Sequence, residues 1–455
     1  MYFKEAFNAK TNQTRSYKFN IFHNFTENIR MKAGSQSSMI KYTDNKSSNS
    51  SILLETGKLS YEWALGTMKI IAKIREKYEK SKPLSDFKLG FCLHITKETS
   101  VLLMATKKLG ANISICSANP LSVQEDIVEF LNYNDINVYA TKNQTKKEFF
   151  NNIINVVKTK PEIITDDGAE MHSIVHNKKI KSVIAGTEET TSGILRILSI
   201  QSNKRLNYPI IGVNDAKTKH LFDNRYGTGQ STIDGLLRTL GILIAGKNFV
   251  VCGYGWVGKG ISSALRGLGA KVTITEVNPI RALEAHLDGF NVRRLKDTLT
   301  MGDCFITCTG QRDVIDKEDF SLMKNGVFLA NAGHFDVEIN VHYLQMQDKF
   351  PKQIRPYLEC YNFKGKKIYL IAKGRVINLI AAAGNASEVM DLSFTNQLLC
   401  ILYIVENYKI LEKKLYPVPK EIDEEVSRLA LSAFEINIDK LSQKQIHYYF
   451  KNSFL

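Results

Sequence analysis

The sequence is poor in proline, tryptophan and cysteine and has no long apolar run. Of its 455 residues, 9 are Pro, 2 are Trp and 7 are Cys. No two cysteines form a C-x-x-C pair and their number is odd, which argues against a structural zinc site and against a disulfide framework. We therefore expect buried free thiols in a reducing compartment.

A membrane helix needs about 20 consecutive apolar residues, and no stretch of the sequence approaches this length. The longest candidate, residues 398–405, has the length of a core helix, and the beginning of the sequence lacks the apolar block of a secretory signal. We expect a cytoplasmic protein with no membrane partner. A composition of 44% hydrophobic and 24% charged residues is globular, and the length predicts two or three domains.

Acidic residues are scarce relative to basic ones: 46 Asp and Glu stand against 61 Lys and Arg, a formal net charge of +15. Such an excess raises nucleic acid, an anionic membrane or an acidic protein as a partner. About a third of it lies in residues 1–50, which end in the low-complexity stretch TDNKSSNSS and which we interpret as a flexible basic extension. The remainder forms no basic block, so we expect no nucleic-acid partner.

Beyond residue 57 the sequence alternates between helical and strand-like segments. Residues 61–80 have the apolar spacing of one amphipathic helix. The short β-type runs FKLGFCLHI, ANISICS, INVYAT and KSVIAGT follow, and a second series contains KNFVVCGYG, KVTITEV, DCFITCTG and GVFLANAG. This alternation predicts an α/β fold with two successive units.

The clearest local motif is a glycine-rich loop between a strand and a helix. Gly253, Gly255 and Gly258 form G-x-G-x-x-G, the dinucleotide-binding pattern, in which glycines allow a tight turn and close approach of the pyrophosphate to the backbone. Glu276 ends the next strand 18 residues after Gly258 and favours NAD over NADP. Arg281 leaves the alternative of a 2′-phosphate open, although a solvated cation at a helix start is the simpler interpretation.

Several polar clusters follow apolar runs. Asp166-Asp167-Gly168 follows PEIIT, a Glu-Glu-Thr-Thr-Ser-Gly run (residues 188–193) follows KSVIAGT, and Lys219 stands four residues before Asp223. Taken singly, these patterns are also typical of a turn, a helix cap and a surface ion pair. Together, they suit a site that moves protons on a polyol.

In this order, GTEETTSG, VNDAKTKHLFDNRYGTGQST, GYGWVGKG, NAGHFDVEI and SEVMDLSFTNQ closely resemble S-adenosylhomocysteine hydrolases, in particular the archaeal and thermophilic-bacterial branch. The resemblance runs from about residue 57 to the end of the sequence. It implies reversible hydrolysis of S-adenosylhomocysteine to adenosine and homocysteine. In this family, bound NAD transiently oxidises the ribose 3′-hydroxyl, homocysteine is eliminated, and water adds.

The resemblance also implies roles for individual residues. Lys219 would be the base for the 3′-hydroxyl, with a pKa lowered by desolvation and tuned by Asp223. Glu189 would hold the ribose hydroxyls, and Asp167 with His94 would transfer protons around the 4′ and 5′ positions. Further substrate contacts would come from Thr96, Glu98 and His334. Contacts with NAD would come from Thr190, Thr191, Ser192, Asn224, Gly253, Gly255, Val257, Gly258, Glu276, Arg281, Thr309, Ala332, Gly333, His334, Asn378 and Asn385.

One position departs from the family pattern. Most members have Gly-His-Pro-Ser where this chain has Gly384-Asn385-Ala386-Ser387, and Asn385 cannot titrate. Gating, rate or product release can therefore differ, and a catalytically weak NAD- or adenosine-binding homologue that regulates a partner is the alternative. S-inosylhomocysteine is a second alternative substrate, against which Glu98 argues because hypoxanthine lacks the exocyclic amine.

These observations predict a Rossmann-type NAD-binding domain inserted into a discontinuous α/β substrate domain. We expect the substrate domain at residues 51–224 and 385–425, the NAD domain at 225–384 and a C-terminal segment at 426–455. The active site would lie in the cleft between the domains, with hinges at the two crossings. We expect no metal, and the family resemblance implies a homotetramer.

Overall fold

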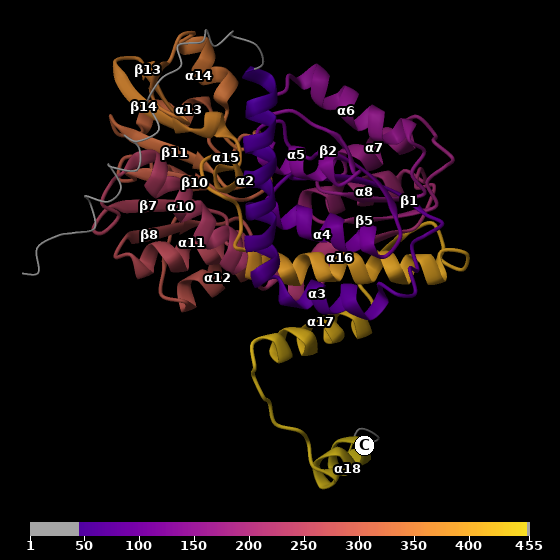
Figure 1. Cartoon of the computed structure of the whole chain (residues 1–455). Helices are drawn as coiled ribbons and strands as arrows, with labels where there is room; N and C mark the ends of the chain where they lie inside the picture. The colour runs from indigo at the N-terminus through magenta and orange to yellow at the C-terminus, as the bar shows by residue number, and fades with distance from the viewer. Residues whose placement is uncertain (1–44, 453–455) are drawn as a thin grey trace, which may run out of the picture. The chain divides into compact units, whose positions relative to one another are not determined.

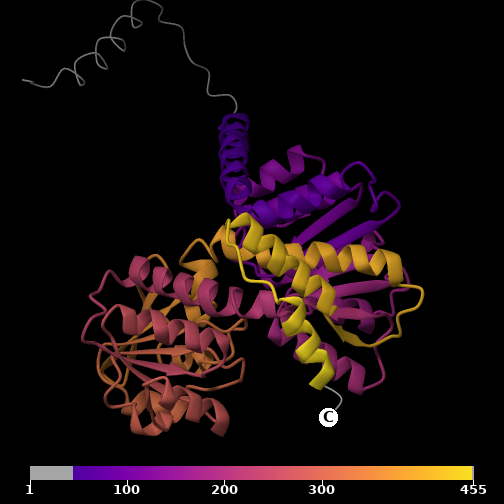
Figure 2. The same cartoon turned by 90° about the horizontal axis from the view of Figure 1, so that it is seen from below.

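The computed structural model describes residues 45–452, shown in colour in Figure 1. Almost all of the expected extension, residues 1–44, lies outside the described residues. Two sheets organise the fold, and both belong to the compact unit that begins at Ser50. Helices cover both faces of the eight-stranded sheet, as Figure 2 shows. The predicted α/β architecture with two successive units is confirmed.

The first sheet has seven parallel strands in the order β15-β6-β5-β4-β1-β2-β3. Its strands are β1 (Lys88–Leu93), β2 (Asn112–Ser117), β3 (Asn137–Tyr139), β4 (Ile163–Asp166), β5 (Ala185–Glu188), β6 (Ile210–Gly212) and β15 (Leu415–Pro417). The central strands are apolar and buried, as parallel strands covered on both faces must be. β15 returns from far along the chain, so this unit is discontinuous in sequence.

The second sheet has eight strands in the order β12-β13-β14-β11-β10-β7-β8-β9. Its strands are β7 (Asn248–Cys252), β8 (Lys271–Thr275), β9 (Asn291–Val292), β10 (Cys304–Thr307), β11 (Val327–Asn331), β12 (Lys352–Arg355), β13 (Leu358–Phe363) and β14 (Lys366–Ile371). Strands β12 to β14 pair antiparallel at one edge, and the others are parallel.

Most helices connect successive strands, as right-handed parallel crossovers require. The helices up to the end of the first unit are α2 (Asn45–Thr67) and α3 (Lys69–Tyr78), which precede β1, and α4 (Lys97–Lys108), α5 (Glu125–Tyr133), α6 (Lys146–Lys158), α7 (Glu170–Asn177), α8 (Thr191–Ser202) and α9 (Lys217–His220). They continue with α10 (Thr228–Leu240), α11 (Trp256–Gly267), α12 (Pro279–Leu287), α13 (Lys317–Leu322), α14 (Val341–Gln347) and α15 (Ile377–Ile380). The last three are α16 (Ser387–Asn407), α17 (Lys420–Ala433) and α18 (Gln443–Asn452).

Two helix boundaries differ from the sequence-based prediction. The single helix expected over residues 61–80 is broken at Met68, whose ψ of 69° is not helical, so α2 and α3 are separate. Asp391 accepts hydrogen bonds from the N–H groups of Ile70 and Ile71, which fixes the new helix start. The low-complexity stretch TDNKSSNSS, expected to be flexible, is also helical from Asn45 onward, because a nucleated helix adds residues more easily than it starts.

Helix α16 is long and apolar enough to cross a membrane by length and composition, which the sequence scan did not anticipate. Its most apolar window is 72% buried inside the protein, and it packs against α3 and α17, beside which it runs in Figure 1. We interpret it as a core helix. All seven cysteines carry free thiols, as predicted, and five of them are buried.

Each sheet has a point where the strand order reverses, and ligands of open α/β sheets bind in the crevice at such points. In the first sheet the reversal lies between β1 and β4, and in the second between β7 and β10. The loops that follow these four strands begin at His94, Asp167, Gly253 and Cys308. Sheet topology alone therefore places the predicted catalytic and dinucleotide loops at the two expected crevices.

Candidate functional site

Three predicted side chains follow neighbouring strands of the first sheet and form one wall of a cleft. His94 follows β1, Asp167 follows β4 and Glu189 follows β5, so the carboxyl ends of adjacent strands bring them together. Asp167 and Glu189 are buried, at 6% and 4% exposure. Carboxylates removed from water interact strongly with nearby charges, as a proton-transfer site requires.

Asp167 lies between two histidines. His94 Nε2 is 3.3 Å from its Oδ2, and His334 Nδ1, which comes from the second sheet, is 3.6 Å from its Oδ1. Burial lowers the pKa of both histidines, and the charge of Asp167 opposes this change. The ligand atoms of the three side chains lie within 4.8 Å of one another, so the same set could also hold a metal ion.

Lys219 lies in a second cluster beside this wall. Its Nζ is 3.6 Å from Glu189 Oε1 and 3.5 Å from Asp223 Oδ2, and it donates a hydrogen bond to Asn224 Oδ1 at 3.0 Å. A surface ion pair was one interpretation of the four-residue spacing, but the side chains of Lys219 and Asp223 are only 4% and 9% exposed. Asp223 begins a single π-helical turn, Asp223–Gly227, a feature that often marks functional sites.

The predicted direction of the Lys219 pKa shift is wrong in this structure. Burial, the largest single influence, lowers the pKa of Lys219, but the charges of Asp223 and of the other two carboxylates of the cleft raise it above its ordinary value. Burial also raises the pKa of Glu189 to about 7, against the charge of Lys219. The sequence-based prediction included the effect of burial on the pKa of Lys219 but not the opposite effect of three nearby carboxylates, Asp223, Glu189 and Asp167.

Thr96 and Glu98 lie at the start of α4. Thr96 caps this helix, accepting from the N–H of Thr99. Glu98 is 2% exposed; its Oε1 accepts from Ser387 Oγ at 2.7 Å and lies 2.5 Å from Lys97 Nζ. No hydrogen bond of Glu98 Oε2 is recorded within the described part of the chain, which leaves this oxygen available to a ligand donor.

The glycine loop after β7 has the geometry of a phosphate cradle. Gly253 has a φ of +108°, which glycine adopts readily, and a Cβ on Gly258 would lie 2.0 Å from the carbonyl oxygen of Gly253. A Cβ on Gly255 would meet only Arg281 Nη1, at 3.8 Å, within the described residues. No described side chain caps α11, so its first N–H groups face this open space.

Glu276 lies at the end of β8, as predicted. Its carboxylate accepts hydrogen bonds from the backbone N–H groups of Tyr254, Val277 and Asn278, at 2.7 to 2.9 Å. These bonds hold it beside the glycine loop, where a ribose would lie. Arg281 is exposed at the start of α12, and its Nη1 lies 3.8 Å from the position that a Cβ on Gly255 would take.

The loop after β10 is held by a residue that sequence reasoning missed. Glu338 is fully buried and accepts from the N–H and Oγ1 of Thr309 and from the N–H of Gly310, at 2.8 to 2.9 Å. A Cβ on Gly333 would lie 1.7 Å from its Oε1. Glu338 stands in the NAGHFDVEI motif, but nothing in the sequence shows that it reaches the preceding loop.

One cavity of about 890 Å³ collects these groups. Every predicted site residue lines it except Gly258, which packs against Gly253 instead. The lining includes His94, Thr96, Glu98, Asp167, Glu189, Thr190, Thr191, Ser192, Lys219, Asp223, Asn224, Gly253, Gly255, Val257, Glu276, Arg281, Thr309, Ala332, Gly333, His334, Asn378 and Asn385. Thr190 also caps α8, so the helix-cap interpretation and the site interpretation both hold for it.

Two polar side chains of the core helix α16 were also missed. Ser393 Oγ donates to Asp223 Oδ2 at 2.8 Å, and Gln397 Nε2 donates to Glu189 Oε2 at 2.5 Å. They stand four residues apart and therefore on one face of the helix. Polar residues four positions apart in an otherwise apolar helix were the pattern from which this role could have been predicted.

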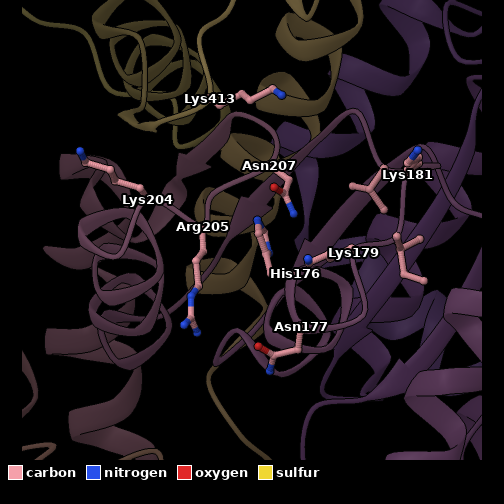
Figure 3. A pocket seen from close by; sticks show the side chains of 10 residues that line it. His176, Asn177, Lys179, Lys181, Lys204, Arg205, Asn207 and Lys413 are labelled. Carbon is pink, nitrogen blue, oxygen red and sulfur yellow. The ribbon is translucent and has the colours of Figure 1, made fainter.

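A second pocket, of about 740 Å³, lies at the amino ends of the first sheet's strands, where α7 and α8 end. Figure 3 shows its basic side chains, Lys179, Lys181, Lys204, Arg205 and Lys413. Exposed cations of this kind stabilise helix carboxyl ends. No carboxylate stands among the described residues that line this pocket, so it offers no acid–base pair, and we place the chemistry in the first cavity.

Comparison with protein families gives two matches. The family described as "S-adenosyl-L-homocysteine hydrolase, NAD binding domain" matches residues 224–384, and "S-adenosyl-L-homocysteine hydrolase" matches residues 49–186. Among solved structures, the A subunit of dipicolinate synthase from Bacillus halodurans is 12% identical with a TM-score of 0.42, covering 70% of this chain and 98% of that one. A likeness this weak carries no functional argument.

Curated relatives are far more similar. The chain is 49% identical to the adenosylhomocysteinase of Sulfurisphaera tokodaii over 398 residues, which cover 87% of this chain and 96% of the relative. It is 45% identical to the adenosylhomocysteinase of Aquifex aeolicus, with the same shares covered. It is also 44% identical to the S-inosyl-L-homocysteine hydrolase of Methanocaldococcus jannaschii, again over 87% and 96%.

Proposed function

Because the chain belongs to the S-adenosyl-L-homocysteine hydrolase family, we propose that it hydrolyses S-adenosyl-L-homocysteine reversibly to adenosine and L-homocysteine. The chain is a hydrolase with an NAD-binding Rossmann domain, and NAD is its cofactor. The observation that best supports the substrate and the reaction is the shared cavity. Lys219 with its carboxylates and Asp167 with its histidines face the same space as the dinucleotide loop.

The residues present fit NAD. The space beside Gly255, the uncapped start of α11 and the carboxylate of Glu276 match a pyrophosphate and an unphosphorylated ribose. Thr309, held by Glu338, and Asn378 would complete the pocket. When bound, NAD supplies reversible oxidation of the ribose 3′-hydroxyl, which acidifies the neighbouring C4′ hydrogen.

The protein's own residues would then hold and move protons. Lys219 accepts the proton of the 3′-hydroxyl while Asp223 keeps its Nζ in place. Lys219, whose pKa the surrounding carboxylates raise, must first give up a proton, and Glu189, whose Oε1 is 3.6 Å from its Nζ and whose pKa is raised to about 7, can hold it. Asp167 and His94 serve the C4′ and C5′ positions, at the other end of the ribose.

Glu98 would select the base. A carboxylate accepts a hydrogen bond from the exocyclic amine of adenine, whereas hypoxanthine presents an oxygen at that position and would repel it. Burial of Glu98 at 2% exposure makes such a mismatch costly. This favours the adenosyl substrate over the inosyl substrate of the Methanocaldococcus jannaschii relative.

Further properties are part of the same proposal. The substrate domain comprises residues 51–224 and 385–425, the NAD domain residues 225–384, and the hinges lie at the two crossings. The enzyme acts in the cytoplasm, in the methyl cycle of one-carbon metabolism, as a homotetramer. The cavity, whose lining is drawn from both sheets, supports the division into two domains, and membership of the family supports the other properties.

The test is release of homocysteine thiol by purified protein that contains NAD. S-adenosylhomocysteine and S-inosylhomocysteine are supplied in parallel. We expect turnover of the adenosyl compound at a kcat/KM at least about tenfold higher. Turnover of neither compound by NAD-containing protein would refute the proposal in favour of a catalytically weak homologue, and a preference for the inosyl compound would refute the role given to Glu98.

A further inference from the structure

Asn385 stands at the crossing where the chain returns from the second sheet to the first. Its amide reaches Asp223, which stands at the other crossing, where the chain passes from the first sheet to the second. Its Nδ2 donates a hydrogen bond to Asp223 Oδ1 at 2.8 Å. Asp223 is 6% exposed, so its carboxylate is largely surrounded by protein atoms and a protein donor to this oxygen matters. The family resemblance places Asn385 in the cofactor pocket and connects it with gating, and the contact with Asp223 adds a different role.

The orientation of the amide is set by partners on both sides. Nδ2 also approaches Thr228 Oγ1, at 3.4 Å, while Oδ1 accepts from Asn378 Nδ2 at 3.3 Å. Oδ1 also lies 2.8 Å from Ser231 Oγ, whose single proton has the Gly227 carbonyl oxygen as a second acceptor at 2.8 Å. Since an ionised carboxylate only accepts and Asn378 Nδ2 only donates, the reversed orientation would lose both bonds. The nitrogen of Asn385 is therefore committed to Asp223.

The backbone of the first crossing leaves room for this amide. Gly227 closes the π-helical turn that Asp223 begins, and a Cβ on Gly227 would lie 2.9 Å from both Cγ and Nδ2 of Asn385. A side chain there would displace the amide from Asp223. Glycine at this position is thus explained by the contact itself, without any demand for a positive φ.

The second oxygen of Asp223 is held independently. Its Oδ2 accepts from Ser393 Oγ at 2.8 Å and lies 3.5 Å from Lys219 Nζ. One oxygen therefore faces the lysine and the helix α16, and the other faces Asn385. With both oxygens fixed, the carboxylate cannot rotate away from Lys219.

We propose that Asn385 is a positioning residue, whose amide holds the Asp223 carboxylate against Lys219 and thereby joins the two crossings between the sheets. This inference rests on the proposed function, because its test measures the rate at which adenosine reduces the bound NAD. Since the amide does not ionise at any pH at which the protein is folded, this donor is present throughout the working range. The proton-handling pair is complete only while the two crossings are in contact.

The test compares Asn385→Asp with the matched control Ser231→Ala. Asn385→Asp keeps the shape but replaces the donor by a carboxylate facing Asp223, whereas Ser231→Ala removes a hydroxyl that contacts the other side of the same amide. The readout is the rate at which adenosine reduces the bound NAD, with NAD content, KM and thermal unfolding measured in parallel. We expect Asn385→Asp to lower the rate by about 10²-fold with NAD retained, and Ser231→Ala to lower it by less than about fivefold.

Two further variants settle the remaining outcomes. Asn385→His can donate from its ring and should keep the rate within about tenfold of wild type. If Asn385→Asp does not fold, Asn385→Ala is measured in its place, and we expect about a 10²-fold loss. Equal rates in wild type and Asn385→Asp, or equal losses in Asn385→Asp and Ser231→Ala, would overturn the proposal. A wild-type protein that adenosine does not reduce would instead refute the proposed function.

Discussion

The carboxyl edges of the two sheets contribute to the cavity in different ways. The edge of the first sheet presents buried ionisable groups, Asp167 and Glu189, to which Lys219 is added from a nearby helix. The edge of the second presents glycines and backbone N–H groups around Gly255. Proton transfer requires side chains with altered pKa values, whereas dinucleotide binding requires close approach to the backbone. Chemistry and cofactor binding should therefore be separable by substitution.

The largest effect is expected at the first edge. Lys219→Met keeps the length of the side chain but removes its charge and its proton acceptor. We expect kcat for homocysteine release to fall by at least about 10³-fold, because the 3′-hydroxyl loses its base. NAD content of the purified protein should stay unchanged, since no cofactor contact is assigned to Lys219.

The control for this variant is Lys217→Met, which removes an exposed lysine from the same helix, α9. It should retain activity within about threefold of wild type. If adenosine still reduced the bound NAD at the wild-type rate in Lys219→Met, the assignment of the base would be wrong. Loss of NAD from Lys219→Met would show that the two edges are not separable.

At the edge of the second sheet we expect a substitution to impair NAD binding and to leave the proton-transfer side chains in place. A Cβ at Gly255 meets only Arg281 Nη1, at 3.8 Å, so Gly255→Val should fold with near-normal thermal stability. Its side chain would occupy the space that the pyrophosphate needs, and we expect NAD affinity to fall by at least about 10²-fold. Isothermal titration with NAD measures this, and full cofactor retention would contradict the loop assignment.

The two edges also differ in how far their features could be predicted from the amino-acid sequence. The glycine loop could be predicted because a short local motif determines its phosphate-binding geometry. Gly253 and Gly255, and Glu276 at the end of the next strand, lie where the motif places them. The chemistry of Lys219 was not predictable in the same way. The direction of its pKa shift depends on the sum of burial and three carboxylates from separate segments, which no local pattern reports.

The same limit applies to supporting residues. Glu338 and Ser393 act on loops and carboxylates far from them in sequence, and their contacts follow from tertiary packing. The fold class followed from the alternation of elements, but the break at Met68 depends on Asp391, more than 300 residues away. Local patterns thus predicted elements and motifs, and packing decided helix boundaries and pKa values.

A smaller effect is expected at the adenine end of the cavity. Glu98→Gln gives the side chain a donor that can face the oxygen of hypoxanthine, while its own oxygen can still face the amine of adenine. We expect the preference for S-adenosylhomocysteine over S-inosylhomocysteine, as a ratio of kcat/KM, to fall by about tenfold or more. An unchanged ratio would show that Glu98 does not read the base, and NAD content serves as the control.

The smallest effect concerns stability at the first edge, where burial raises the pKa of Glu189 to about 7. Because the folded-state pKa lies above the ordinary value, the stability linked to this proton is full below about pH 4.5 and is lost as pH rises through about 7. The upper bound is about 3 kcal/mol, or a few °C in Tm. Glu189→Gln should therefore show a smaller fall in Tm than wild type between pH 5 and pH 8, with Lys217→Met keeping the wild-type slope. Equal slopes in Glu189→Gln and wild type would mean that the pKa of Glu189 lies below this range, which would make its carboxylate too weak a base to hold the proton of Lys219.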